Sequence, residues 1–122
     1  MTQEQKAVLE AGGFGVEEAM QRFMNSEQLW IKFLKKFKAD TSFGDLVKAM
    51  EEKNATKAFE ASHTLKGITG NLALTEFNRL VGEQTEYLRG TEINFEAAEA
   101  MMPQLKEVYE KTLKIINEVC GE

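Results

Sequence analysis

The sequence is poor in the residues that build covalent or metal frameworks. Its 122 residues include one cysteine, Cys120, one histidine, His63, and one proline, Pro103. One cysteine allows no internal disulfide, and one cysteine with one histidine is too few for a Cys/His metal cluster. The scarcity of proline excludes Pro-rich, collagen-like and other low-complexity classes. We therefore expect a fold held together by its hydrophobic core, with no metal and no cofactor of its own.

The sequence also lacks an excess of positive charge and long hydrophobic runs. The formal net charge is −5, and the charged residues, 29% of the chain, are spread along it. Nucleic-acid-binding modules are normally basic, so this charge argues against nucleic acid as a partner. No apolar run approaches the roughly 18 residues of a membrane span, and the first residues are polar with no apolar segment behind them. With the lone cysteine, these features predict a cytoplasmic protein without a membrane partner, and nothing demands more than a monomer.

Apolar residues are plentiful and recur at helical spacing. Hydrophobic residues make up 43% of the chain, enough for a sizeable core at this length. Stripes at i, i+3, i+4 and i+7 predict helices nearly everywhere, and no stretch alternates for long enough to indicate a strand. Ser26 and Asn54 are expected to be N-caps. The predicted helices cover residues 2–11, 16–23, 26–38, 43–50, 54–72, 74–88 and 94–120.

The single proline leaves two possibilities for the last helix. Pro103 either lies in the first turn of a helix that runs to Cys120, or kinks one helix that starts at Asn94, and we favour the kinked helix. The connections between predicted helices are short, which makes successive helices antiparallel neighbours. We therefore predict one all-α domain over residues 1–122, an antiparallel up-down four-helix bundle with the short N-terminal helices as a lid.

Two glycines interrupt the helix predicted for residues 54–72. In a helix interior, Gly67 and Gly70 each cost about 1 kcal/mol relative to alanine. At about 100° per residue, His63 points away from the apolar stripe, and both glycines follow on the same side with Lys66 beside them. This face therefore leaves space for a large group to approach an exposed imidazole, with a cation one turn away.

Phosphoryl transfer is the chemistry that suits this arrangement. Histidine in short peptides has a pKa of about 6.5, so a neutral imidazole is available as a nucleophile near pH 7. An exposed ring nitrogen can accept a phosphoryl group and release it again, and a lysine ammonium can stabilise the added charge. Two simpler interpretations remain open: His63 is an ordinary surface residue, or the glycines allow close packing of a neighbouring helix.

The segment around the histidine resembles the signature of the histidine-containing phosphotransfer (HPt) domain. The residues that carry the resemblance are Ser62-His63-Thr64-Leu65-Lys66-Gly67, followed by Gly70, Leu72 and Leu74. Ser62 and Ala73 depart from the family, which often has alanine before the histidine and glycine ten residues after it. Both replacements are small, so they leave the role of His63 in place.

The resemblance implies a phosphorelay intermediate that is a carrier and not an enzyme. His63 would accept a phosphoryl group from the aspartate of a response-regulator receiver domain, or from a hybrid sensor kinase relay, and pass it to another receiver. Lys66 would stabilise the phosphate, and Gly67 and Gly70 would give the partner access. Mg²⁺ would be required only in the receiver.

The same helix face is expected to bind the partner. It comprises Thr56, Phe59, Glu60, Thr64, Asn71 and Leu74. Trp30, which is large and at the edge of its stripe, is a further candidate for contact with a partner. The alternatives are a non-phosphorylated helical adaptor that binds receiver or kinase domains, and an unrelated helical module or ligand-binding bundle. Burial of the His63 imidazole would favour the last class.

Overall fold

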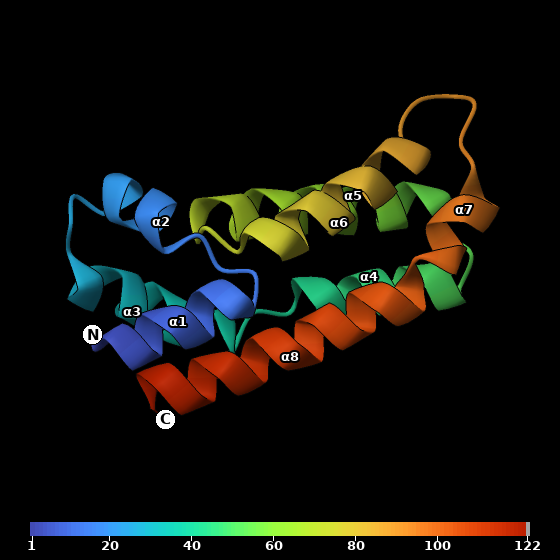
Figure 1. Cartoon of the computed structure of the whole chain (residues 1–122). Helices are drawn as coiled ribbons and strands as arrows, with labels where there is room; N and C mark the ends of the chain where they lie inside the picture. Colours follow the sequence, from blue (N-terminus) through green and yellow to red (C-terminus); the bar gives the residue numbers. More distant parts are fainter. Residues whose placement is uncertain (122) are drawn as a thin grey trace.

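The computed structural model describes residues 1–121, which form eight helices and no strand (Figure 1). The all-α class predicted from the sequence is therefore confirmed for this part of the chain. The helices are α1 (Gln3–Ala11), α2 (Val16–Arg22), α3 (Glu27–Phe37), α4 (Ser42–Glu51), α5 (Ala55–Asn71), α6 (Thr75–Tyr87), α7 (Phe95–Ala100) and α8 (Met102–Cys120).

The helices lie in two layers (Figure 1). In one layer α5 and α6 run side by side, and in the other α3 and α4 follow one another beside the 19-residue α8. Helix α4 packs against α5, and α8 packs against both α3 and α6. Helix α5 thus has a neighbouring helix on each side, and its remaining face lies open.

The N-terminal segment covers the end of the molecule at which α5 turns into α6. Helix α1 packs against α8 and α2. The loop between α1 and α2 pairs with the α5–α6 turn through backbone hydrogen bonds. The Gly15 N–H donates to the Ala73 carbonyl (2.8 Å), and the Glu76 N–H donates to the Gly13 carbonyl (3.0 Å). These backbone hydrogen bonds fix the turn that ends the histidine-bearing helix.

One hydrophobic cluster contains buried residues from all eight helices. At its centre four aromatic rings from α3, α4, α6 and α8 pack together. They are Phe37, Phe43, Phe77 and Tyr109, and the rings of Phe43 and Tyr109 stack with centroids 4.2 Å apart. Such aromatic pairs add stability beyond the area they bury, so this cluster ties the two layers to each other.

The predicted N-caps are confirmed. The Ser26 hydroxyl accepts a hydrogen bond from the Leu29 N–H (3.1 Å), and the Asn54 side chain accepts one from the Lys57 N–H (3.1 Å). Each side chain satisfies one of the N–H groups that a helix start leaves without an intrahelical partner. The first turn of α5 therefore begins where local sequence signals place it.

The prediction of one kinked helix from Asn94 is wrong. Helix α7 ends at Ala100, Met101 forms the junction, and α8 begins at Met102 with Pro103 in its first turn. Proline suits this position because its ring presets a helical φ and its missing N–H would have had no intrahelical acceptor. The alternative of Pro103 at the start of the last helix is the one that the structure contains.

The prediction that Trp30 contacts a partner is also wrong. Its side chain has 0% exposure, and the indole Nε1–H donates to the Leu72 carbonyl at the end of α5 (2.8 Å). The indole meets the ring of Phe14 edge-on, with centroids 6.5 Å apart. Trp30 therefore anchors α3 beneath the α5–α6 turn.

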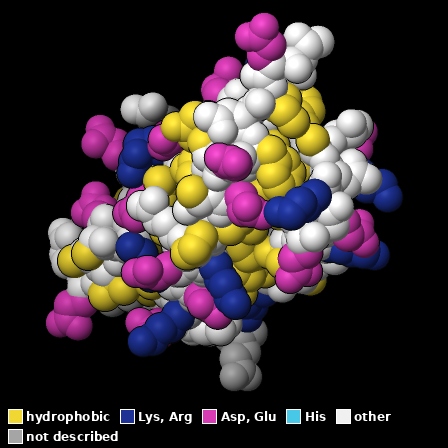
Figure 2. Space-filling view, turned by 90° about the vertical axis from the view of Figure 1, so that its right-hand side faces the viewer, with side chains coloured by type: hydrophobic (Ala, Val, Ile, Leu, Met, Phe, Trp, Pro, Cys, Tyr) yellow, Lys and Arg dark blue, Asp and Glu magenta, His cyan; other side chains and the backbone are white. Residues whose placement is uncertain are grey.

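The surface carries both signs of charge. At the end of the molecule where α7 lies, acidic and basic side chains are interspersed around patches of apolar surface (Figure 2). Within residues 1–121, no helix combines the length and the apolar character that crossing a membrane requires.

Candidate functional site

His63 lies near the middle of α5 on its exposed side. The opposite side of the helix is buried and consists of Ala58, Ser62, Leu65 and Thr69. The helical phase predicted from the sequence is therefore correct, and the imidazole is accessible to solvent. Burial of this ring would have favoured a ligand-binding bundle or an unrelated helical module, and the ring is exposed.

The imidazole is flanked on one side by an aromatic ring. Phe59, one turn earlier on α5, stacks on His63 with ring centroids 5.7 Å apart and an interplanar angle of 13°. The Arg89 guanidinium lies over the ring of Phe59, 5.3 Å from its centroid, and its Nε donates to Glu86 (2.9 Å). Phe59 is half-buried and stacks on the imidazole, so it limits the rotamers of His63, which is itself exposed.

A buried polar cluster sets the rotation of α5 directly beneath His63. The Ser62 hydroxyl, with 0% exposure, lies 2.7 Å from the Thr85 hydroxyl of α6. Gln84 of α6, also fully buried, donates to the Ala98 carbonyl of α7 (3.0 Å). Buried hydroxyl and amide groups are costly unless they are hydrogen-bonded, so the Ser62–Thr85 pairing favours one orientation of α5 against α6, and the Gln84–Ala98 bond ties α6 to α7. The serine that departs from the HPt pattern therefore has a structural role.

Lys66 lies at the seam between α5 and α6. Its side chain is half-buried, and its aliphatic stem crosses Gly82 of α6, where an added Cβ would lie 3.6 Å from Lys66 Cε. Its backbone carbonyl accepts a hydrogen bond from Asn78 Nδ2 (2.8 Å). No acidic group among the described residues forms an ion pair with Lys66, so its charge is available to a ligand.

The two glycines after His63 have different surroundings. A Cβ at Gly67 would meet nothing within 4 Å, so this glycine leaves open space beside the imidazole. A Cβ at Gly70 would lie 3.2 Å from Asn78 Nδ2 of α6, a contact tighter than ordinary packing. Gly70 was predicted to give a partner access, but its local effect is to make room for Asn78. The contact with Asn78 agrees with the close-packing interpretation for Gly70, whereas an added Cβ at Gly67 would have open space around it.

Most of the predicted docking residues share the His63 face. Thr56, Glu60, Thr64 and Asn71 are exposed, and Phe59 is half-buried beside the imidazole. Leu74 is only 1% exposed, so its predicted place on this face is wrong. Ala73 adopts a left-handed conformation (φ 57°), which reverses the chain and turns Leu74 into the core as the N-cap residue of α6.

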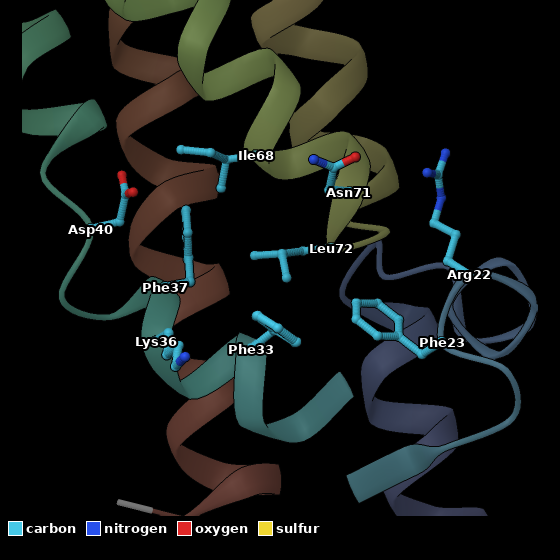
Figure 3. Close-up of a pocket in the computed structure, with 9 residues that line it drawn as sticks. All are labelled: Arg22, Phe23, Phe33, Lys36, Phe37, Asp40, Ile68, Asn71 and Leu72. Atoms are coloured by element: carbon cyan, nitrogen blue, oxygen red, sulfur yellow. The ribbon is translucent and has the colours of Figure 1, made fainter. Parts of the chain in front are cut away.

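An apolar groove that the sequence did not reveal adjoins this face. It has a volume of about 540 Å³ and lies between α2, α3 and the last turn of α5 (Figure 3). The groove is lined by Arg22, Phe23, Phe33, Lys36, Phe37, Asp40, Ile68, Asn71 and Leu72. Phe33 is 38% exposed and its ring centroid is 5.8 Å from that of Phe23. Both rings lie at helical apolar spacing, which is typical of core residues, and only the relative positions of α2, α3 and α5 show that they line an opening.

The site offers an exposed imidazole and a lysine that has no ion-pair partner among the described residues. Within residues 1–121, no group of three or more His, Cys, Asp or Glu side chains is placed to hold a metal ion. An exposed imidazole with an unpaired lysine one turn away and an open glycine beside it can accept a compact anionic group. Comparisons of the chain with protein-family models, with curated proteins and with solved structures each find no match.

Proposed function

We propose that this protein is a phosphorelay intermediate, a phosphocarrier that receives a phosphoryl group on His63 and passes it to a second acceptor. The observation that carries the proposal is the solvent-exposed imidazole in mid-helix, with open space at Gly67 and the unpaired Lys66 beside it. The resemblance of residues 62–74 to the HPt signature supports the same assignment. In this proposal α4, α5, α6 and α8 form the antiparallel up-down four-helix bundle of such a domain, and α1 and α2 form its lid.

The transfer step forms one bond and breaks another. The lone pair of one neutral imidazole nitrogen attacks the phosphorus of a phosphorylated aspartate, while the other ring nitrogen keeps its hydrogen. The bond between phosphorus and the carboxylate oxygen breaks, and its electron pair returns to the aspartate. In the onward step a carboxylate oxygen attacks phosphorus, and the P–N electron pair returns to His63. Lys66 stabilises the negative charge of the phosphoryl group in both directions.

The partner supplies the remaining chemistry. The donor and acceptor are receiver domains, alone or within a hybrid sensor kinase in the cytoplasm, and any Mg²⁺ belongs to their aspartate site. The protein acts as a monomer, and the partner docks on the face that surrounds His63. This face presents Thr56, Glu60, Thr64 and Asn71. Asn71 also lines the groove next to Phe33, so the docking surface continues from a polar face onto an apolar one.

Transfer from phosphorylated receivers tests the proposal directly. We expect a panel of phosphorylated receiver domains to include donors that give the protein a single phosphoryl group, stable in base and labile in acid. Mass spectrometry under neutral conditions should place the group on His63. Binding of receivers without any transfer would instead support a non-phosphorylated adaptor, and labelling of another residue would overturn the assignment of His63.

Substitution of Gly67 should separate stability from partner access. Gly67→Ala places a Cβ in open space and is expected to raise the free energy of unfolding by about 1 kcal/mol, because alanine is a better helix former. Gly67→Gln is expected to slow transfer from a receiver by about tenfold or more, because its side chain occupies the approach to the imidazole. Urea denaturation and transfer rates measure the two effects.

A small donor provides the control for Gly67→Gln. Phosphoramidate needs no docking surface, so it should label His63 of this variant at nearly the wild-type rate. If receivers also transfer to the variant at the wild-type rate, Gly67 does not lie on the path of the partner.

A further inference from the structure

Gly82 is an unexpected residue in the middle of α6. Glycine is the least favourable residue in a helix interior after proline, and Gly82 is neither a turn residue nor at a helix end. Its backbone needs no special conformation, because it is absent from the positions with positive φ. What lies over it is the side chain of Lys66, with Cε and Cδ at 3.6 and 3.8 Å from the position of an added Cβ.

Helix α6 holds Lys66 at two points that share one face. Asn78 and Gly82 are four residues apart, so they are neighbours on the surface of α6. Asn78 Nδ2 donates to the Lys66 carbonyl (2.8 Å) and to Thr69 Oγ1 (3.2 Å), which fixes the backbone of α5 at this turn. Gly82 leaves a shallow seat for the stem of Lys66. The two contacts act on one residue, one on its backbone and one on its side chain.

The seat changes what the lysine can do. A lysine stem on an open helix surface samples many rotamers, and holding it costs conformational entropy when a ligand binds. A stem that already packs along the α5–α6 seam has lost part of that freedom, and no acidic side chain among the described residues pairs with its charged end. Lys66 is three residues after His63, so the two side chains are adjacent on the surface of α5.

We propose that Gly82 is a positioning residue, the seat that holds the Lys66 side chain beside His63 so that its ammonium meets a phosphoryl group on the imidazole. The proposal rests on the proposed function of His63 and assigns a role to a residue on a different helix. Gly82 touches neither the imidazole nor the phosphoryl group and acts through Lys66 alone.

Two substitutions of Gly82 test the seat. Gly82→Ala adds a Cβ at van der Waals distance from Lys66, so the stem stays in place, and the seat requires a small residue at this position and not glycine in particular. Gly82→Leu fills the seat and displaces the stem, and Gly82→Gln does the same with a polar side chain should leucine impair folding. Phosphoramidate labels each variant without a receiver: an imidazole nitrogen bonds to phosphorus, the donor P–N bond breaks and ammonia leaves. The half-life of the phosphohistidine is then measured at neutral pH, and circular dichroism verifies the fold.

The expected result is a size-dependent loss. Gly82→Ala should keep the wild-type half-life, whereas Gly82→Leu and Gly82→Gln should shorten it about fivefold, the effect of losing one nearby charge in a solvent-exposed pair. Lys66→Met keeps an unbranched stem without the charge and should shorten the half-life by the same factor. Nuclear Overhauser effects test the seat in the unphosphorylated protein. The wild type should show them between Lys66 Hε and Gly82 Hα. In Gly82→Leu, Lys66 Hε should show none to the backbone of residue 82.

A double-mutant cycle distinguishes positioning from a general structural effect. In the Lys66→Met background, Gly82→Leu should have no further effect on the half-life, because there is no ammonium left to displace. Two outcomes would overturn the role of Gly82 and leave the proposed function of His63 in place. One is an equal shortening of the half-life by Gly82→Leu in both backgrounds, and the other is an unchanged half-life in Gly82→Leu with His63 phosphorylated. Absence of any label on wild-type His63 would overturn the proposed function and the role of Gly82 with it.

Discussion

His63→Gln should abolish acceptance of a phosphoryl group from receivers and from phosphoramidate alike. The lone pair of the glutamine amide nitrogen is delocalised into its carbonyl, so the side chain keeps polarity but loses the nucleophile. His63 is exposed, and substitutions at exposed positions usually change the free energy of unfolding by no more than about 0.5 kcal/mol. Loss of acid-labile label with an unchanged unfolding midpoint would therefore be a chemical effect.

A matched substitution on the other layer of the molecule controls for handling and folding. Lys114→Gln changes an exposed residue of α8, which packs against α3 and α6 and does not carry the histidine face. This variant should be labelled at the wild-type rate. Label on the His63→Gln variant at the wild-type level would place the acceptor elsewhere in the chain.

Trp30→Ala should produce the largest loss of stability of any single substitution considered. Removal of a fully buried aromatic side chain typically costs about 3–5 kcal/mol because it leaves a cavity. The Leu72 carbonyl also loses its indole donor, and leaving a buried acceptor unsatisfied costs about 1–3 kcal/mol. Small domains have a total stability of about 5–15 kcal/mol, so this variant should be partly unfolded at room temperature.

Trp30→Phe separates the two contributions. Phenylalanine keeps an aromatic ring against Phe14 but cannot donate to Leu72, so it should be destabilised by less than the alanine variant. Urea denaturation followed by far-ultraviolet circular dichroism measures both, since the chain has no other tryptophan for fluorescence. A cost below about 1 kcal/mol for Trp30→Ala would contradict its place in the core.

The features that the sequence predicted correctly depend on residues within one or two helical turns. Ser26 and Asn54 cap their helices through hydrogen bonds to N–H groups three residues on. The exposure of His63 follows from the 3.6-residue repeat, once the apolar stripe of α5 is recognised. Helix content and the orientation of the candidate nucleophile were therefore predictable without knowledge of the tertiary packing.

The features that were missed depend on distant segments or on an unusual backbone. Trp30 lies at the edge of its stripe, and its buried indole N–H is satisfied by the carbonyl of Leu72, the distant residue that caps the C-terminal end of α5. Leu74 continues an apolar pattern, and its direction is set by the left-handed conformation of Ala73, which alanine seldom adopts. Gly82 has no visible purpose in the sequence, and the role of Gly70 stayed open between partner access and close packing, because each glycine meets a side chain from the facing helix.

The hydrogen bonds of Ser62 and Gln84 have a consequence for protein engineering. The Ser62 hydroxyl of α5 pairs with Thr85 and donates to Gln84 Oε1 (3.4 Å), both on α6, so α5 is held on its buried side. The exposed positions Thr56, Glu60, Thr64 and Asn71 therefore contribute little to folding. A combinatorial library restricted to those four codons would retain the scaffold while it varies the surface offered to other molecules. Folding and binding can thus be selected separately on this helix, which makes α5 a suitable surface on which to engineer binding of a chosen partner.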